Sequence, residues 1–150
     1  MRFLDYIEQG FERVLVVDTE FRFDSTKTVP EKVLCFVYQD VFTGEIFRYW
    51  EHEIDSSQKH FNYDDCLLIS FNATAEYGSY LKQMHGKPRQ MWDCFVENKR
   101  LYFPFRQKGK FGMIDTCEAY GIKGIMTKEE KKENLDLIIN NTSYNLAQQK

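Results

Sequence analysis

Two acidic residues end the most apolar run of the chain. Residues 13–18 (RVLVVD) are β-branched and apolar up to Asp18, and Glu20 follows two positions later. Because side chains alternate along a strand, the two carboxylates point to the same side. Side by side they repel each other and lose hydration, and a divalent cation relieves both costs. Hard oxygen donors of this kind suit Mg²⁺ or Mn²⁺; the plainer alternative is two solvated acids in a turn.

A third carboxylate follows another apolar run. Residues 66–71 (CLLISF) predict a buried strand, Asn72 offers a helix cap, and Glu76 falls in the first turn of the helix that follows. A glutamate there complements the helix dipole, which is its structural interpretation. In the functional interpretation, Glu76 faces the Asp18/Glu20 pair from an adjacent element.

The elements that must position these acids alternate between strand and helix patterns. Apolar runs predict strands at 13–18, 33–40, 45–50 and 66–71, with a shorter candidate at 91–95. Helical patterns cover 75–84, 113–120 and a segment from the Thr127 capping box to about residue 140. Polar loops are expected at 24–32 and 104–112. The Thr43-Gly44 turn makes the second and third strands an antiparallel hairpin. The order predicts an α/β fold with a mixed central sheet and flanking helices.

Composition sets the class of protein. The chain has 150 residues, 43% of them hydrophobic, and a net charge of −3, which predicts one folded domain over residues 1–150 and no general polycation. No apolar run could span a bilayer, so no membrane partner is expected. The four cysteines form no CxxC pair and the N-terminus resembles no signal peptide, so we expect buried, reduced thiols in a cytoplasmic protein. Neither common nucleotide-binding glycine motif is present.

The ordered set of motifs resembles the DEDD (DnaQ-like) 3′–5′ exonucleases, and most closely the proofreading exonuclease domain of family-A DNA polymerases. Asp18-Thr19-Glu20 matches the family's D-x-E motif, and residues 71–76 (FNATAE) fall in the register of its H-N-x-x-F-D motif. Residues 91–94 (MWDC) resemble its W-D-T segment, and residues 113–122 (MIDTCEAYGI) resemble a later helix ending in Y-G-I.

The resemblance implies a ribonuclease H-like fold and a two-ion site for Mg²⁺ or Mn²⁺. Asp18 would bridge both ions, Glu20 would hold the nucleophile-side ion, and Glu76 would act through water on the other. The implied activity is hydrolysis at the 3′ end of single-stranded DNA, as the proofreading part of a polymerase whose polymerase domain lies C-terminal. The residues implied to contact the terminal nucleotides flank the motifs: Thr19, Phe21, Phe71, Asn72 and Tyr77.

The sequence also departs from the family pattern. Glu76 stands where the family usually has Asp, and Phe71 replaces the usual His. The third motif, Y-x-x-x-D or H-x-x-x-x-D, is absent and would be expected shortly beyond Lys150. We therefore expect a domain truncated before its last catalytic element, with an incomplete metal site and weak or no activity on its own. The basic loop at Lys108-Gly109-Lys110 is a candidate phosphate contact, or simply a solvated loop.

Two alternatives keep the fold and change the function. The chain could be a catalytically incomplete nucleic-acid-binding or structural fragment, which the missing third motif favours. It could also be an RNA-directed exonuclease resembling ribonuclease D or oligoribonuclease, because the motifs do not separate the two sugars.

Overall fold

The computed structural model describes residues 10–23, 30–54, 65–83, 88, 90–102 and 111–140. The strands are β1 (Arg13–Phe23), β2 (Pro30–Asp40), β3 (Ile46–Trp50), β4 (Cys66–Ser70) and β5 (Gln90–Asp93). The helices are the 3₁₀ turn η1 (Glu51–Glu53), α2 (Ala73–Gln83), α3 (Cys94–Tyr102), α4 (Met113–Ala119) and α5 (Lys128–Asn140). The α/β class expected from the sequence is therefore confirmed.

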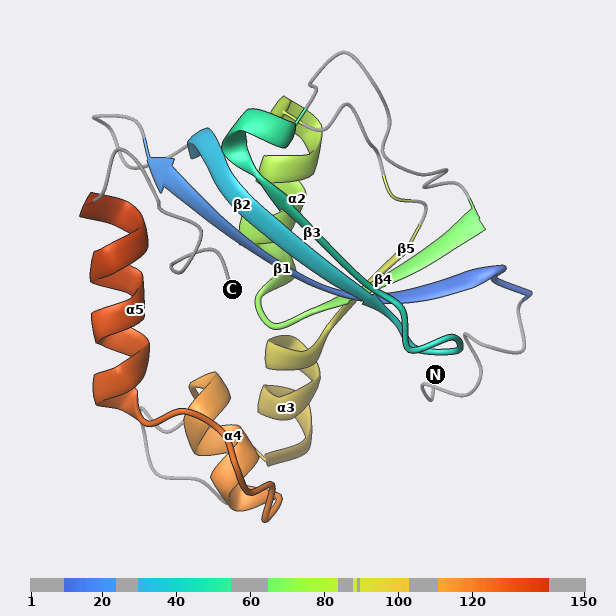
Figure 1. The fold of residues 1–150 in the computed structure, drawn as a ribbon. Helices are drawn as coiled ribbons and strands as arrows, with labels where there is room; N and C mark the ends of the chain where they lie inside the picture. Colours follow the sequence, from blue (N-terminus) through green and yellow to red (C-terminus); the bar gives the residue numbers. More distant parts are fainter. Residues whose placement is uncertain are drawn as a thin grey trace.

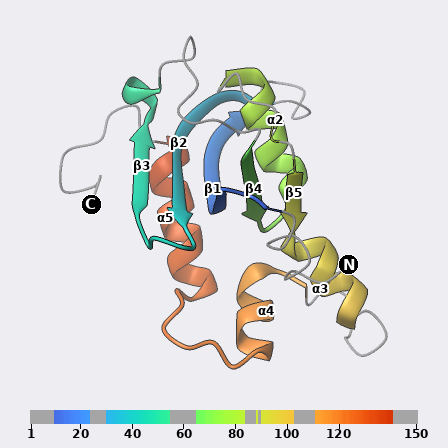
Figure 2. The same cartoon turned by 90° about the vertical axis from the view of Figure 1, so that its right-hand side faces the viewer.

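The five strands form one mixed sheet in the order β3-β2-β1-β4-β5, seen face-on in Figure 2. The first three strands pair antiparallel, and β4 and β5 add in parallel to β1. The early hairpin is therefore confirmed, with its tight turn leading into β3. The most buried strand, β4, and its neighbour β1 lie at the centre, where both faces can be covered.

Helices lie on both faces of this sheet. Figures 1 and 2 show α2 on one face and α5 on the other, with α3 and α4 beyond one end of the strands. Beneath α2 the core is built from alternate residues of β1, with Leu15 and Val17 packed among side chains of β2 and β4. A run as apolar as residues 13–18 is typical of a strand covered on both faces, but on the α5 face Val14 is fully buried while Val16 is 45% exposed. The physical reason is that this helix covers only part of the strand.

Cross-strand aromatic pairs account for part of the chain's high aromatic content. Phe36 lies opposite Tyr49, and Tyr38 lies opposite Phe47, in the register of β2 and β3. The rings stack with centroids 4.8 and 4.6 Å apart, respectively. Such a pair contributes about 0.5–1.5 kcal/mol beyond its buried area, so these residues fix the hairpin that flanks β1.

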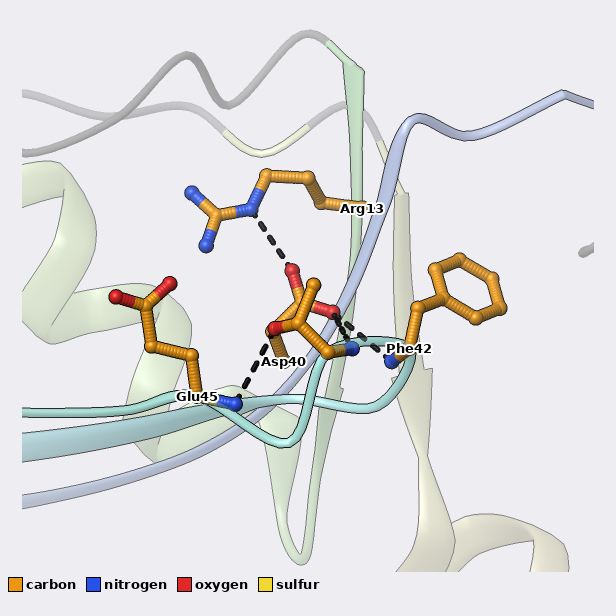
Figure 3. Close-up of polar contacts among 5 residues, drawn as sticks. Arg13, Asp40, Phe42 and Glu45 are labelled. Carbon is orange, nitrogen blue, oxygen red and sulfur yellow. Dashed lines mark hydrogen bonds and ion pairs between the residues drawn. The ribbon is translucent and has the colours of Figure 1, made fainter.

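The turn after β2 is organised by one carboxylate. Figure 3 shows Asp40 Oδ2 accepting a hydrogen bond from Arg13 Nε at 3.0 Å, while Oδ1 accepts from the backbone amides of Phe42 and Thr43. The Thr43 hydroxyl then accepts from the amide of Glu45 at 3.2 Å. Burial raises the pKa of Asp40, but the Arg13 hydrogen bond and the two amides outweigh it, so its pKa lies below the ordinary value.

Two segments differ from the sequence-based expectation. The loop expected at 24–32 gives way to strand at Pro30, and its residues 24–29 lie outside the described residues. The strand candidate at 91–95 ends at Asp93, and a helix that the sequence analysis missed, α3, begins at Cys94. Its cause is local: Asp93 Oδ1 accepts hydrogen bonds from the amides of Phe95 and Val96, which makes Asp93 the N-cap.

No helix in the described part of the chain is both long and apolar enough to cross a membrane.

Candidate functional site

The Asp18/Glu20 pair lies on the face of β1 that α5 covers. The pairing of β1 with β2 shifts by one residue between Glu20 and Phe21, which marks a β-bulge directly after the pair. Bulges bend a strand and redirect its side chains, and they occur often beside active sites. Both carboxylates line a cavity of about 340 Å³ between this part of the sheet and α5. The sequence prediction that the two acids share one face is therefore matched by the structure.

The environment of the pair favours a positive ligand. Burial raises the pKa of Glu20, the neighbouring Asp18 raises it further, and Lys131 of α5 lowers it. Cys35 lies opposite Glu20 in the strand pairing, and burial together with the two carboxylates raises its thiol pKa to about 11. A neutral thiol therefore borders the pair at neutral pH, and Lys131 is the cation that α5 brings to it.

Glu76 approaches β1 from the opposite side. It is the fourth residue of α2 and is only 4% exposed. Thr19 is the residue of β1 that lowers the pKa of Glu76. The buried atoms Glu76 Oε2 and Thr19 Oγ1 have no hydrogen-bond partner. Burial raises the pKa of Glu76 to about 8, Thr19 opposes the rise, and Asp18 and Glu20 add to it. Glu76 is therefore a buried acid that is mostly protonated at neutral pH, and both Asp18 and Glu20 raise its pKa.

The three acids form a pair and a neighbour. Asp18 and Glu20 share one cavity, whereas Glu76 is not among the described residues that line it. Within the described ranges, no group of three or more His, Cys, Asp or Glu side chains is arranged to hold a metal ion. The donor chemistry nevertheless fits Mg²⁺ or Mn²⁺, because carboxylate oxygens are their preferred ligands and Glu76 Oε2 is a buried oxygen without a partner.

The contribution of α5 to this site was not predicted from the sequence. The Thr127–Glu130 capping box was expected, and the structure confirms it, with each residue's side chain accepting the other's amide. The expectation did not place the helix over Asp18 and Glu20, where Lys131, Asn134 and Leu135 line the cavity. The only available signal was the amphipathic spacing of this helix, which leaves its partner face undetermined.

The predicted nucleotide contacts lie in several places. Phe71 packs against Phe95 with ring centroids 5.6 Å apart and lines a second cavity, next to α3 and α4. Phe21 and Tyr77 are half-buried on β1 and α2, and Thr19 is buried beside Glu76. The candidate phosphate contact at Lys108-Gly109-Lys110 lies outside the described residues.

Asn72, expected as a helix cap, takes a left-handed conformation, with φ of 83°. The cap comes from the neighbouring strand β5, because Asp93 accepts hydrogen bonds from the amides of Asn72 and Ala73. Asp93 thus fixes the starts of both α2 and α3, and with them the position of Glu76.

Comparison with known proteins gives a structural likeness only. No protein-family model matches the sequence, and no curated protein matches it at significant similarity. The crystal structure of Trypanosoma brucei RNase D superposes with a TM-score of 0.59 and 10% identity, covering 91% of this chain and 50% of that chain. The structure of the same enzyme in complex with RNA U12 gives a TM-score of 0.44 and 12% identity, covering 62% of this chain and 35% of that one. The chain therefore spans about half the length of the RNase D chain in the first comparison, and its mixed sheet with flanking helices has the ribonuclease H-like fold.

Proposed function

We propose that this chain is a single 3′–5′ exonuclease-like domain that hydrolyses phosphodiesters at the 3′ end of single-stranded nucleic acid with a divalent metal. The observation that carries the proposal is the Asp18/Glu20 pair, which lines a cavity on a bulged central strand while Glu76, with one buried oxygen that lacks a partner, lies behind that strand. Groups with strongly perturbed pKa values gather at functional sites because chemistry requires them there. The fold shared with RNase D is compatible with this activity.

Each acid has a role that follows from its place. Asp18 is exposed in the cavity and Glu20 is half-buried beside it, so these two would hold Mg²⁺ or Mn²⁺. When bound, such ions lower the pKa of a water nucleophile and stabilise the leaving 3′ oxygen. Glu76 would support the site from behind, and its protonated form avoids a third negative charge while the site is empty.

RNA is the first substrate to test, because the matched fold belongs to an enzyme named as a ribonuclease. The DNA-directed proofreading role, with a polymerase domain as its partner, rests on the motif resemblance of Asp18-Thr19-Glu20 and residues 71–76 alone. Phe21 and Tyr77, half-buried near the acids, are proposed to stack terminal bases of either polymer.

The test is a degradation assay with Mn²⁺ on 5′-labelled single-stranded RNA and DNA of matched sequence. We expect stepwise shortening from the 3′ end, faster on RNA, and a loss of about 100-fold in Asp18→Asn and Glu20→Gln. Glu12→Gln is the matched control, because Glu12 is exposed ahead of β1, away from the cavity. Activity unchanged in Asp18→Asn would overturn the site assignment. No activity in the wild type, despite Mn²⁺ binding at Asp18, would favour the catalytically incomplete alternative.

A further inference from the structure

A second cavity, larger than the one at the acidic pair, lies next to α3 and α4. These two helices lie side by side beyond the end of the sheet in both views (Figures 1 and 2). The cavity has a volume of about 540 Å³, within the range of small-molecule sites. Met113 is the one described residue that lines both cavities, so the second is a separate site.

One polar side chain in its lining has an atom without a hydrogen-bond partner. Asn98 of α3 is only 4% exposed, and its Nδ2 donates a hydrogen bond to Thr116 Oγ1 of α4 at 2.7 Å. Its other amide atom, Oδ1, is buried with no hydrogen-bond partner. A buried acceptor without a donor is costly, and native proteins seldom leave one unpaired. The contact with Thr116 uses the amide nitrogen, so the atom of Asn98 that still needs a partner is an acceptor.

Flat aromatic side chains contribute to the rest of the lining. Phe71, Trp92 and Tyr120 border the cavity from β5 and from the segments that follow β4 and α4. The charged side chains of the lining include Glu97 and Arg100, which neutralise each other in an ion pair at 2.9 Å. A ligand for this cavity is therefore flat, largely apolar and uncharged in the part that enters, with one N–H donor for Asn98.

We propose that this cavity binds a nucleobase, with Asn98 Oδ1 accepting a hydrogen bond from an exocyclic amino group. Aromatic faces stack on any base, and an asparagine amide pairs with the amino edge of adenine. The site uses neither Asp18 nor Glu20, so base binding does not depend on the proposed hydrolysis.

The test compares adenosine with purine riboside, which lacks only the amino group. The chain has two tryptophans, so in a Trp50→Phe background Trp92 alone reports from the cavity. We expect saturable quenching by adenosine, about tenfold weaker binding of purine riboside, and no difference between the two nucleosides in Asn98→Leu. Calorimetry on the chain that keeps Trp50 compares the affinities of adenosine and purine riboside without the Trp50→Phe substitution.

Two further variants keep the result interpretable. Cys117→Phe fills the cavity from α4 and should abolish adenosine binding, even if Asn98→Leu fails to fold. Asp18→Asn should bind adenosine as the parent does. The proposal is overturned if neither nucleoside binds, if both bind equally, if the preference survives in Asn98→Leu, or if Asp18→Asn loses binding. The last result would place the nucleoside at the acidic pair.

Discussion

Asp40 and Glu76 are equally buried carboxylates with opposite chemistry. Each is 4% exposed, and each contacts or approaches β1, Asp40 beside its first residue and Glu76 beside Thr19. Asp40 is paired with Arg13 and accepts two backbone amides, and its pKa is lowered. Glu76 has a buried oxygen without a partner, two other carboxylates near it, and a pKa of about 8.

The difference shows that burial raises the pKa of both acids, and that only around Asp40 do the hydrogen bonds from Arg13 and two backbone amides outweigh this rise. At the Asp40 end, the chain supplies donors for the oxygens and the carboxylate stabilises the turn. At the Glu76 end, the neighbouring charged groups are the carboxylates of Asp18 and Glu20. Three negative charges this close disfavour folding unless a proton or a cation compensates. One end of β1 is therefore stabilised by its partners, and the other carries the acids that we propose to bind metal.

The largest change in the free energy of unfolding is expected for Glu76→Gln. The pKa of Glu76 is raised from 4.5 in the unfolded chain to about 8, so its contribution to stability is full below pH 4.5 and is lost as pH rises through 8. The glutamine variant lacks this loss and should be more stable than the wild type above pH 8, by up to about 4 kcal/mol. Urea unfolding at pH 4 and pH 9 measures the difference; a constant difference across this range would contradict the assigned state.

Asp40→Asn should show the reverse. Asp40→Asn removes the negative charge that accepts the Arg13 hydrogen bond, and we expect a loss of about 1.5–3 kcal/mol at pH 7. Because the pKa of Asp40 is lowered, its contribution is present above about pH 4 and is lost as pH falls through the folded-state value. The difference in unfolding free energy between the variant and the wild type should therefore be smaller in acid. Urea unfolding at pH 7 and pH 3 checks this.

A smaller effect is expected at the start of α5, the helix that covers the acidic pair. Thr127 Oγ1 accepts the amide of Glu130 at 3.1 Å, and Thr127→Ala removes this cap at a cost of about 1 kcal/mol. Thermal unfolding measures the loss. Thr127→Ser keeps the hydroxyl and should lie near the wild type; equal losses in both variants would show that the cap is not the cause.

The smallest effect on stability should come from Lys131→Met. Lys131 is exposed, so the free energy of unfolding should change by less than about 0.5 kcal/mol. Because Lys131 lowers the pKa of Glu20, the variant should raise that pKa while leaving Asp40 unchanged. Carbon-detected NMR titration of both carboxyls provides the comparison, and an unchanged Glu20 would remove α5 from the electrostatics of the site.

Much of this arrangement followed from local patterns. The strand that carries the acids, the hairpin and the capping box could be predicted because period-two apolarity, turn residues and capping pairs are local signals. The predicted end of that strand at Asp18 was wrong, because β1 continues in its pairing with β2 to Phe23. The helix α3 was missed although its cap is local, because the strand-like pattern of residues 91–95 continues past Asp93, where the helix begins. The placement of α5 over Asp18 and the side from which Glu76 approaches are tertiary, and alternation along one strand cannot show them.

The central claim is that the acids at the Glu76 end of β1 bind a divalent metal and that the Asp40 end does not. Calorimetric titration with Mn²⁺ at pH 7.5 tests this directly in the wild type, Asp18→Asn and Asp40→Asn. We expect binding by the wild type, at least about tenfold weaker binding by Asp18→Asn, and unchanged binding by folded Asp40→Asn. Equal affinity in the wild type and Asp18→Asn, or no binding by any of them, would contradict it.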